Sequence, residues 1–172
     1  MASINLVKIT KVEFADADLT AGVVPEVLKT VEDIKDGTLN LDFPEATVTP
    51  TYGEQTQQVI YTRKAPVMNT AKMEIALPVG ANLADLTGNA FATDTLTIGG
   101  TSTAKNQYLV VTGLNTEGLV TTITCPNTFT TYSWSGAMGA NQELVGWMLT
   151  FSMLQDKTAG KVVCAIKVTP AA

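Results

Sequence analysis

The most informative absence in this sequence is histidine, which does not occur among its 172 residues. Histidine is the commonest general base in enzymes and the commonest ligand of transition metals. Charge is also scarce, since Lys, Arg, Asp and Glu make up 16% of the chain, below the roughly 25% usual in soluble domains. The net charge of −5 opposes the basic face that a phosphate-gripping nucleic-acid binder needs. These absences favour a protein without catalytic chemistry.

Long apolar runs and an export signal are missing as well. No stretch approaches the roughly 18 apolar residues that a membrane helix needs, and the first residues show no basic segment followed by an apolar one. We therefore expect a chain that is made and folded in a cytoplasm and has no membrane partner. The two cysteines, Cys125 and Cys164, each lie in an apolar or β-branched run, as small core residues do. A disulfide between them stays open, although two cysteines make no disulfide framework.

Several short fragments of catalytic motifs occur, and each lacks its context. Ser102–Lys105 has the S-x-x-K spacing of penicillin-recognising enzymes, but it follows two glycines and no S-D-N element accompanies it. Gly99–Lys105 resembles a phosphate loop, yet Asn106 stands where Ser or Thr should hold magnesium. Asp16 and Asp18 alternate without the glycine and glutamate of a calcium loop. We predict no enzyme activity and no catalytic, metal-binding or cofactor-binding residue.

Threonine and period-2 alternation dominate what is present. Threonine favours pleated, half-exposed surface, because its branched Cβ packs on a sheet while its hydroxyl stays hydrated. Alternation of apolar and polar residues predicts strands over much of the chain. Both faces of the last long apolar run look buried, which indicates a central strand. The predicted strands are Ile4–Phe14, Thr38–Phe43, Ala71–Leu77, Ala92–Ile98, Gln107–Thr112, Leu119–Pro126, Thr128–Trp134, Leu144–Leu154 and Val162–Val168.

One helix is predicted, from Asn82 to Phe91. Asn82 suits an N-cap, and Leu83, Leu86 and Ala90 begin an apolar face. About ten strands with a single flanking helix indicate a mainly β sandwich or barrel. The length fits one domain over residues 1–172.

An acidic segment at about residues 15–35 has two interpretations. Val27, Val31 and Ile34 have helical spacing after Pro25, which suits the first turn of a helix. The same residues could form an extended arm that enters a hairpin at Asp36-Gly37, the strongest turn signal in the chain. We favour the extended arm, because clean alternation follows the turn.

The segment at about residues 44–66 is strongly polar and predicts a long hairpin around the Tyr52–Gln55 turn. Its few apolar residues include Val48, Tyr52, Val59 and Tyr61, too few to build a core of its own. A hairpin that cannot stabilise itself is either mobile or covered by a neighbour.

The order of these features resembles the major tail tube proteins of long-tailed bacteriophages. An N-terminal strand, an acidic arm, the Lys35–Leu41 turn and a polar loop come first, and a helix flanked by strands and a hydrophobic C-terminal hairpin follow. The segment Val31–Thr51, in which a D-G-T-L-x-L turn precedes Pro44-Glu45-Ala46-Thr47, is the most similar part. The likeness covers most of the chain and lies in architecture, without a diagnostic motif.

The resemblance implies a structural protein of the virion tail. Members of that family form hexameric rings that stack, with the arm and loop reaching adjacent subunits and one helix outside. DNA passes through an acidic bore without specific binding, and other tail proteins are further partners. We predict subunit contacts at the tip of the polar hairpin and, as a second region, at Trp134: Tyr52, Gly53, Glu54, Gln55, Thr56, Gln57, Gln58 and Trp134.

Two other functions remain open on the sequence. One is a different virion or injection-machine component, such as a head decoration protein or a secretion-tube subunit. The other is a small ligand-binding module that uses Tyr132 and Trp134, although clustered exposed aromatic residues are few. Trp147, inside the most apolar strand, is expected in the core.

Overall fold

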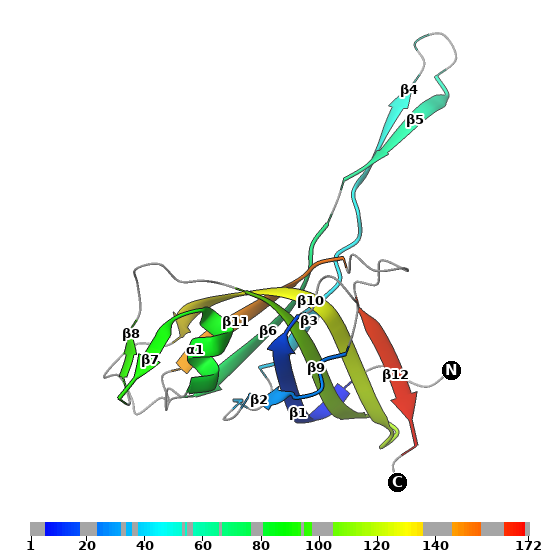
Figure 1. Ribbon diagram of the computed structural model, residues 1–172. Helices are drawn as coiled ribbons and strands as arrows, with labels where there is room; N and C mark the ends of the chain where they lie inside the picture. The colour runs from blue at the N-terminus through cyan, green and yellow to red at the C-terminus, as the bar shows by residue number, and fades with distance from the viewer. Residues whose placement is uncertain are drawn as a thin grey trace, which may run out of the picture.

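The computed structural model describes residues 6–17, 24–31, 34–35, 38–52, 54, 57–65, 67–76, 81–93, 95–97, 105–135, 146–155 and 164–170. Ile4, Asp18, the Asp36-Gly37 turn, Gly99 to Ala104, Leu144 and Val162 lie outside these residues. Within them the chain is mainly β with one short helix, as the sequence predicts (Figure 1).

The body of the protein is built on one eight-stranded sheet. Its order is β2-β1-β9-β10-β11-β6-β3, and β12 also pairs with β10. The pairings between these strands are antiparallel. The strands are β1 (Leu6–Asp16), β2 (Lys29–Thr30), β3 (Asn40–Asp42), β6 (Asn69–Ala76), β9 (Asn106–Asn115), β10 (Val120–Ser135), β11 (Gly146–Met153) and β12 (Ala165–Thr169).

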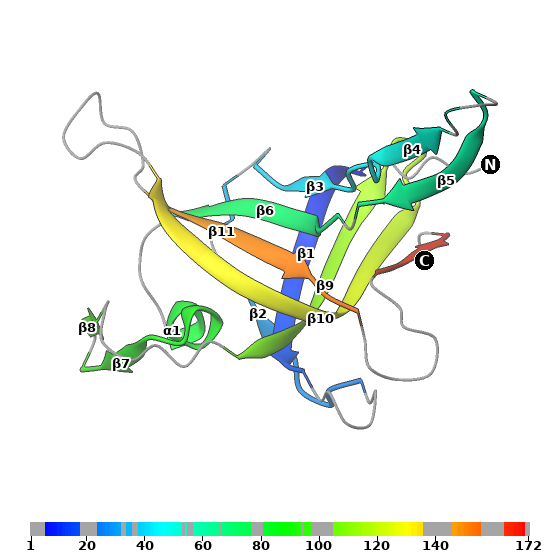
Figure 2. The ribbon, with the colours of Figure 1, turned by 90° about the horizontal axis from the view of Figure 1, so that it is seen from above.

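The long strand β10 joins the two halves of the sheet (Figure 2). Residues 120–124 pair with both β9 and β12, whereas residues 128–135 pair with β11. The register with β9 shifts between Cys125 and Thr128, around Pro126, which has no N–H to donate. The two strands predicted on either side of Pro126 are therefore one continuous strand with an irregularity.

The core lies between the curved halves of this sheet. From Leu109 onward in β9 and from Trp147 onward in β11, every second residue is buried, which is the pattern that their sequence alternation predicts. In β11 the face of Trp147 is buried, but the opposite face of Met148 is only half-buried, so the prediction of two buried faces is wrong. The position of β11 between β10 and β6 is central, as expected. The buried cluster includes Val12, Phe14, Met73, Leu109, Val111, Ile123, Leu149 and Phe151.

Helix α1 (Ala81–Thr87) packs on this core through Leu83 and Leu86. It is shorter than predicted, because Gly88 takes a left-handed φ of 70° and the N–H of Asn89 donates to the carbonyl of Ala84. This is the usual way in which glycine ends a helix.

The residues after the helix form a short hairpin of β7 (Ala90–Ala92) and β8 (Thr95–Thr97). The sequence predicts a single strand over Ala92–Ile98, and that prediction is wrong. Thr93 has a positive φ of 49°, so the chain reverses within the expected strand. Local alternation cannot reveal such a turn at a threonine.

The acidic arm is extended in its described part, as predicted. Strand β2 pairs with β1, and Ile34 forms a bridge to Ile75 of β6. The predicted hairpin is wrong, however, because Ile34 and β3 both pair antiparallel with the same strand β6. Two segments that both run antiparallel to β6 run in the same direction, so Ile34 and β3 follow each other along one sheet edge and do not fold back on each other.

Candidate subunit interface

A two-stranded hairpin of β4 (Val48–Tyr52) and β5 (Val59–Lys64) projects from the body (Figure 1). It forms a sheet of its own. Every side chain that the structure describes in these two strands is exposed. The predicted polar hairpin is therefore present, and no described side chain of its two strands belongs to the core of the body.

The tip of the hairpin carries most of the predicted contact residues. Tyr52, Glu54, Gln57 and Gln58 are exposed there. Gln57 has a positive φ of 53°, and its side-chain amide lies 3.5 Å from the carbonyl oxygen of Glu54. Gly53, Gln55 and Thr56 lie outside the described residues.

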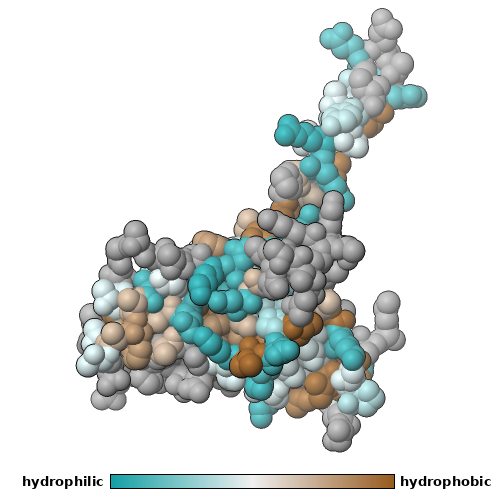
Figure 3. All heavy atoms as spheres, in the orientation of Figure 1, coloured by the Kyte–Doolittle hydropathy of each residue, from teal (hydrophilic) through white to brown (hydrophobic). Residues whose placement is uncertain are grey.

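The hairpin is unusual in exposing large apolar side chains along its length (Figure 3). Val48 is 51% exposed, Tyr52 58%, Val59 50% and Tyr61 62%. Among the described residues, most exposed large hydrophobic side chains lie between residues 43 and 68, in the hairpin and at its base. The predicted site included only Tyr52 of these. Their signal in the sequence is that apolar residues persist in a segment too polar to form a core.

The apolar residues lie on both faces of the hairpin. Val48 is opposite Lys64, and Thr51 is opposite Tyr61, so each pair shares a face. Because positions 48 and 51 are an odd number apart, Val48 and Tyr61 lie on opposite faces. A partner that buried both would have to enclose the hairpin and not merely touch one side.

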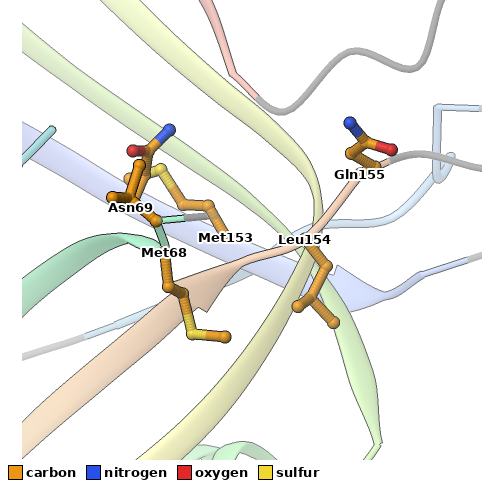
Figure 4. A pocket seen from close by; sticks show the side chains of 6 residues that line it. Met68, Asn69, Met153, Leu154 and Gln155 are labelled. Carbon is orange, nitrogen blue, oxygen red and sulfur yellow. The ribbon is translucent and has the colours of Figure 1, made fainter. Parts of the chain in front are cut away.

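A small groove lies at the base of the hairpin, where the chain enters β6 and leaves β11 (Figure 4). Its volume is about 270 Å³, and no lining residue is charged. Two of these residues are exposed apolar side chains, Val67 (44%) and Met68 (54%). The lining is mixed, because the amide side chains of Asn69 and Gln155 lie beside the apolar ones. The groove is lined by Val67, Met68, Asn69, Met153, Leu154 and Gln155.

Trp134, the second predicted contact, is 43% exposed near the end of β10. Its ring stands edge-on to Trp147, with centroids 4.8 Å apart, and Tyr132 lies 5.6 Å from the same ring. Trp147 itself is buried, as predicted. The end of β10 and the hairpin lie at different ends of the molecule in both views (Figures 1 and 2). The structure thus separates the two predicted contact regions.

Two of the four ion pairs in the described part of the chain are exposed on both sides, whereas the carboxylates of Glu13 and Glu74 in the other two are largely buried. Lys105 Nζ is 2.9 Å from an Asp16 carboxylate oxygen, and this hydrogen bond raises the pKa of Lys105. Lys29 pairs with Asp85, which connects the arm to the helix. Exposed pairs of this kind add little stability. The carboxylates of Asp16 and Asp85 are thus each paired with a lysine of the same subunit.

The described residues contain no group of three or more His, Cys, Asp or Glu that could hold a metal ion. In the same part of the chain, no helix is long and apolar enough to cross a membrane. Lys105 is the lysine of both the S-x-x-K fragment and the fragment that resembles a phosphate loop. In the structure it makes the surface ion pair with Asp16.

No protein-family model matches the sequence, and no curated protein matches it. Among solved structures, the chain is similar to one in a structure described as "Cryo-EM structure of the anti-feeding prophage (AFP) baseplate, 6-fold symmetrised". The alignment covers 97% of this chain and 96% of that one, with 10% sequence identity and a TM-score of 0.46. A TM-score this low carries no argument about function, which has to come from the surfaces of the chain itself.

Proposed function

We propose that this chain is a non-catalytic structural subunit of a phage tail or a related injection machine. In this proposal it assembles with its own copies into stacked rings, and the rings form a tube that DNA traverses. The family resemblance implies that each ring is a hexamer. The observation that carries the proposal is the projecting β4–β5 hairpin, whose large apolar side chains Val48, Tyr52, Val59 and Tyr61 are half or more exposed in their own subunit.

The energetics of the hairpin favour a partner. An isolated two-stranded hairpin is marginally stable in water. Full burial of a Val or a large apolar side chain is worth about 1.5–3 kcal/mol. Val48, Tyr52, Val59 and Tyr61 are half or more exposed, so a neighbour that covered them would gain about half of that at each position.

The sheet edges supply a second argument for assembly. Among the described residues, β3 has β6 as its one strand neighbour and β12 has β10. Open edges of this kind present unpaired main-chain groups that template further strand pairing. Closure of a ring pairs such edges between identical subunits and leaves none open.

The charge of the chain suits a tube that does not retain DNA. A net charge of −5 repels phosphate, so a bore lined by part of this acid would let DNA slide. The proposed mechanism is geometric and electrostatic, with β-pairing and apolar burial between subunits and no chemical step.

Negative-stain electron microscopy of the purified full chain tests the proposal. We expect rings with a central hole, or tubes of stacked rings. A dispersed monomer at high concentration, with no order after tail-tip components are added, would contradict it.

The role of the hairpin is tested by deletion of residues 51–57. We expect a folded protein that no longer polymerises, because the described residues of this segment are all exposed and none belongs to the core of the body. Tyr61→Asp should have the same effect by placing a charge in the buried contact. Tyr61→Phe is the matched control, since it keeps the apolar area and should still assemble. Tubes from the deletion variant would show that the hairpin is not the contact.

A further inference from the structure

Cys125 and Cys164 meet across two neighbouring strands. The register of β10 with β12 ends at the pair Thr124 and Ala165. One step further along this antiparallel ladder, residue 125 comes opposite residue 164. Opposite residues share a face of the sheet, so the two thiols point to the same side. Both cysteines are free, and each thiol shifts the pKa of the other.

The geometry of this pair suits a covalent bond. Opposite residues in an antiparallel pair have Cα atoms about 4.5–5.5 Å apart. That range lies within the roughly 4.4–6.8 Å that disulfides span. Cys164 packs against the buried cluster to which Cys125 belongs, so no side chain has to swing out of the core.

We propose that Cys125 and Cys164 are a redox site that closes into an intrachain disulfide by exchange with a small-molecule disulfide such as oxidised glutathione. The inference concerns the subunit alone and does not depend on ring assembly.

The two cysteines differ in access and in acidity. Cys164 is half-buried, whereas Cys125 is 1% exposed. The hydrogen bond from Cys125 lowers the pKa of Cys164, and the same hydrogen bond together with burial raises the pKa of Cys125. Cys164 is therefore the attacking thiolate and Cys125 the resolving thiol, because the thiolate is the reactive form.

The exchange proceeds in two balanced steps. The Cys164 thiolate attacks one sulfur of the oxidant, which breaks the oxidant's S–S bond, forms a mixed disulfide and releases one thiolate. That thiolate takes the proton of Cys125. The Cys125 thiolate then attacks the Sγ of Cys164 and releases the second small thiolate, which takes up from solvent the proton that Cys164 lost when it ionised. Two protein thiols are oxidised, and one small disulfide is reduced to two thiols.

The bond would join β12 covalently to β10 close to the place where the strand pairing of β10 changes. β10 changes its neighbour from β12 to β11 just beyond Cys125. The main chain there is held by the N–H of Leu154, which donates to the carbonyl of Asn127 over 2.8 Å. β12 is joined to β10 alone among the described strands, so a covalent link would stop it from peeling away.

The test is incubation of the full chain with oxidised glutathione, followed by thiol counting and mass spectrometry. We expect loss of both thiols, a mass lower by two hydrogen atoms, and a peptide that links residues 125 and 164. Amide hydrogen exchange over β12 should slow by about tenfold or more after oxidation, because local opening is blocked. Dithiothreitol should reverse both changes.

Single variants separate the two roles. Cys125→Ala should accumulate a stable mixed disulfide at Cys164, because the resolving thiol is gone. Alanine is used in place of serine, because a buried serine hydroxyl would lack a hydrogen-bond partner. Cys164→Ala should keep its remaining thiol, because Cys125 is buried. Near-ultraviolet circular dichroism confirms that each variant is folded.

Three outcomes would overturn the inference. The wild-type chain could keep both thiols, it could form only interchain disulfides, or it could stop at the same mixed disulfide that Cys125→Ala forms.

Discussion

The body and the projecting hairpin are both built from alternating strands, yet they differ completely in burial. In β9 and β11 every second side chain is buried, whereas β4 buries none of its five residues. The difference lies in what faces each strand. β9 and β11 contribute to one core, while β4 and β5 have only each other. Alternation therefore predicts a strand, and a second layer decides whether its apolar face is used.

This contrast also separates folding from assembly within one chain. The body contains what a subunit needs to fold, because its apolar side chains meet their partners within the subunit. The hairpin adds exposed apolar surface that its own subunit does not cover. Substitutions in the two regions should therefore affect different measurements.

The largest effect on stability is expected for Phe151→Ala in β11. Phe151 is fully buried in the core cluster. Removing a buried aromatic ring leaves a cavity and typically costs about 3–5 kcal/mol of unfolding free energy. Urea denaturation of the dispersed subunit measures this loss. A loss below about 1 kcal/mol would mean that the core does not depend on β11 in the way described.

A slightly smaller loss is expected for Gln107→Leu. Gln107 is fully buried, and its amide nitrogen lies 3.1 Å from the carbonyl oxygen of Leu86, at the end of α1. Its side-chain oxygen accepts a hydrogen bond from the Thr130 hydroxyl. Leucine keeps the volume but leaves these groups unpaired, which costs about 1–3 kcal/mol for each buried group.

Gln107→Glu is the second variant in that experiment, because glutamate has nearly the size of glutamine but lacks the amide donor. It retains the oxygen that accepts from Thr130 but sets a carboxylate beside the helix carbonyls, so it should also destabilise the protein. Urea denaturation of both variants checks the expectation. A neutral result for Gln107→Leu would show that the helix is held by apolar packing alone.

The strands could be predicted from sequence because their cause is local. The period-2 pattern in β1, β6, β9 and β11 reflects one buried face. The alternate residues that form this face lie within a few positions of each other, so a short window of sequence reveals it. The projecting hairpin was predicted for the opposite reason, since residues 44–66 contain too little apolar surface to be buried. Its tip residues Tyr52, Glu54, Gln57 and Gln58 are exposed as expected.

The errors arise where long-range pairing overrides the local pattern. Asp36-Gly37 is a strong hairpin signal, but Ile34 and β3 pair with β6 and not with each other. Pro126 suggests a strand break, yet β10 continues past it because different neighbours pair on each side. The meeting of Cys125 with Cys164 depends on the register of β10 with β12, which no short window of sequence contains.

A smaller effect is expected at the turn between β9 and β10. Gly118 has a left-handed φ of 75°, and the side chain of Asn115 accepts hydrogen bonds from the N–H groups of Glu117 and Leu119. A Cβ at Gly118 would meet no atom within 4 Å. Gly118→Ala should therefore cost only the conformational penalty, about 1 kcal/mol.

Gly118→Asn is the matched comparison, because asparagine tolerates the left-handed region better than alanine. It should cost less than Gly118→Ala in the same denaturation experiment. Equal losses from both variants would indicate that the turn is disturbed by the side chain itself and not by the backbone angle.

The smallest effect on subunit stability is expected for Tyr61→Ala in the hairpin. Tyr61 is a large aromatic residue like Phe151, but it is 62% exposed and lies opposite Thr51 in a sheet of two strands. Surface substitutions of this kind usually change the unfolding free energy by less than about 0.5 kcal/mol. Urea denaturation should therefore leave the dispersed variant close to the wild type, while electron microscopy should show loss of polymerisation. A loss of stability near that of Phe151→Ala would place Tyr61 in the folding core of its own subunit, and the contrast between hairpin and body would then fail.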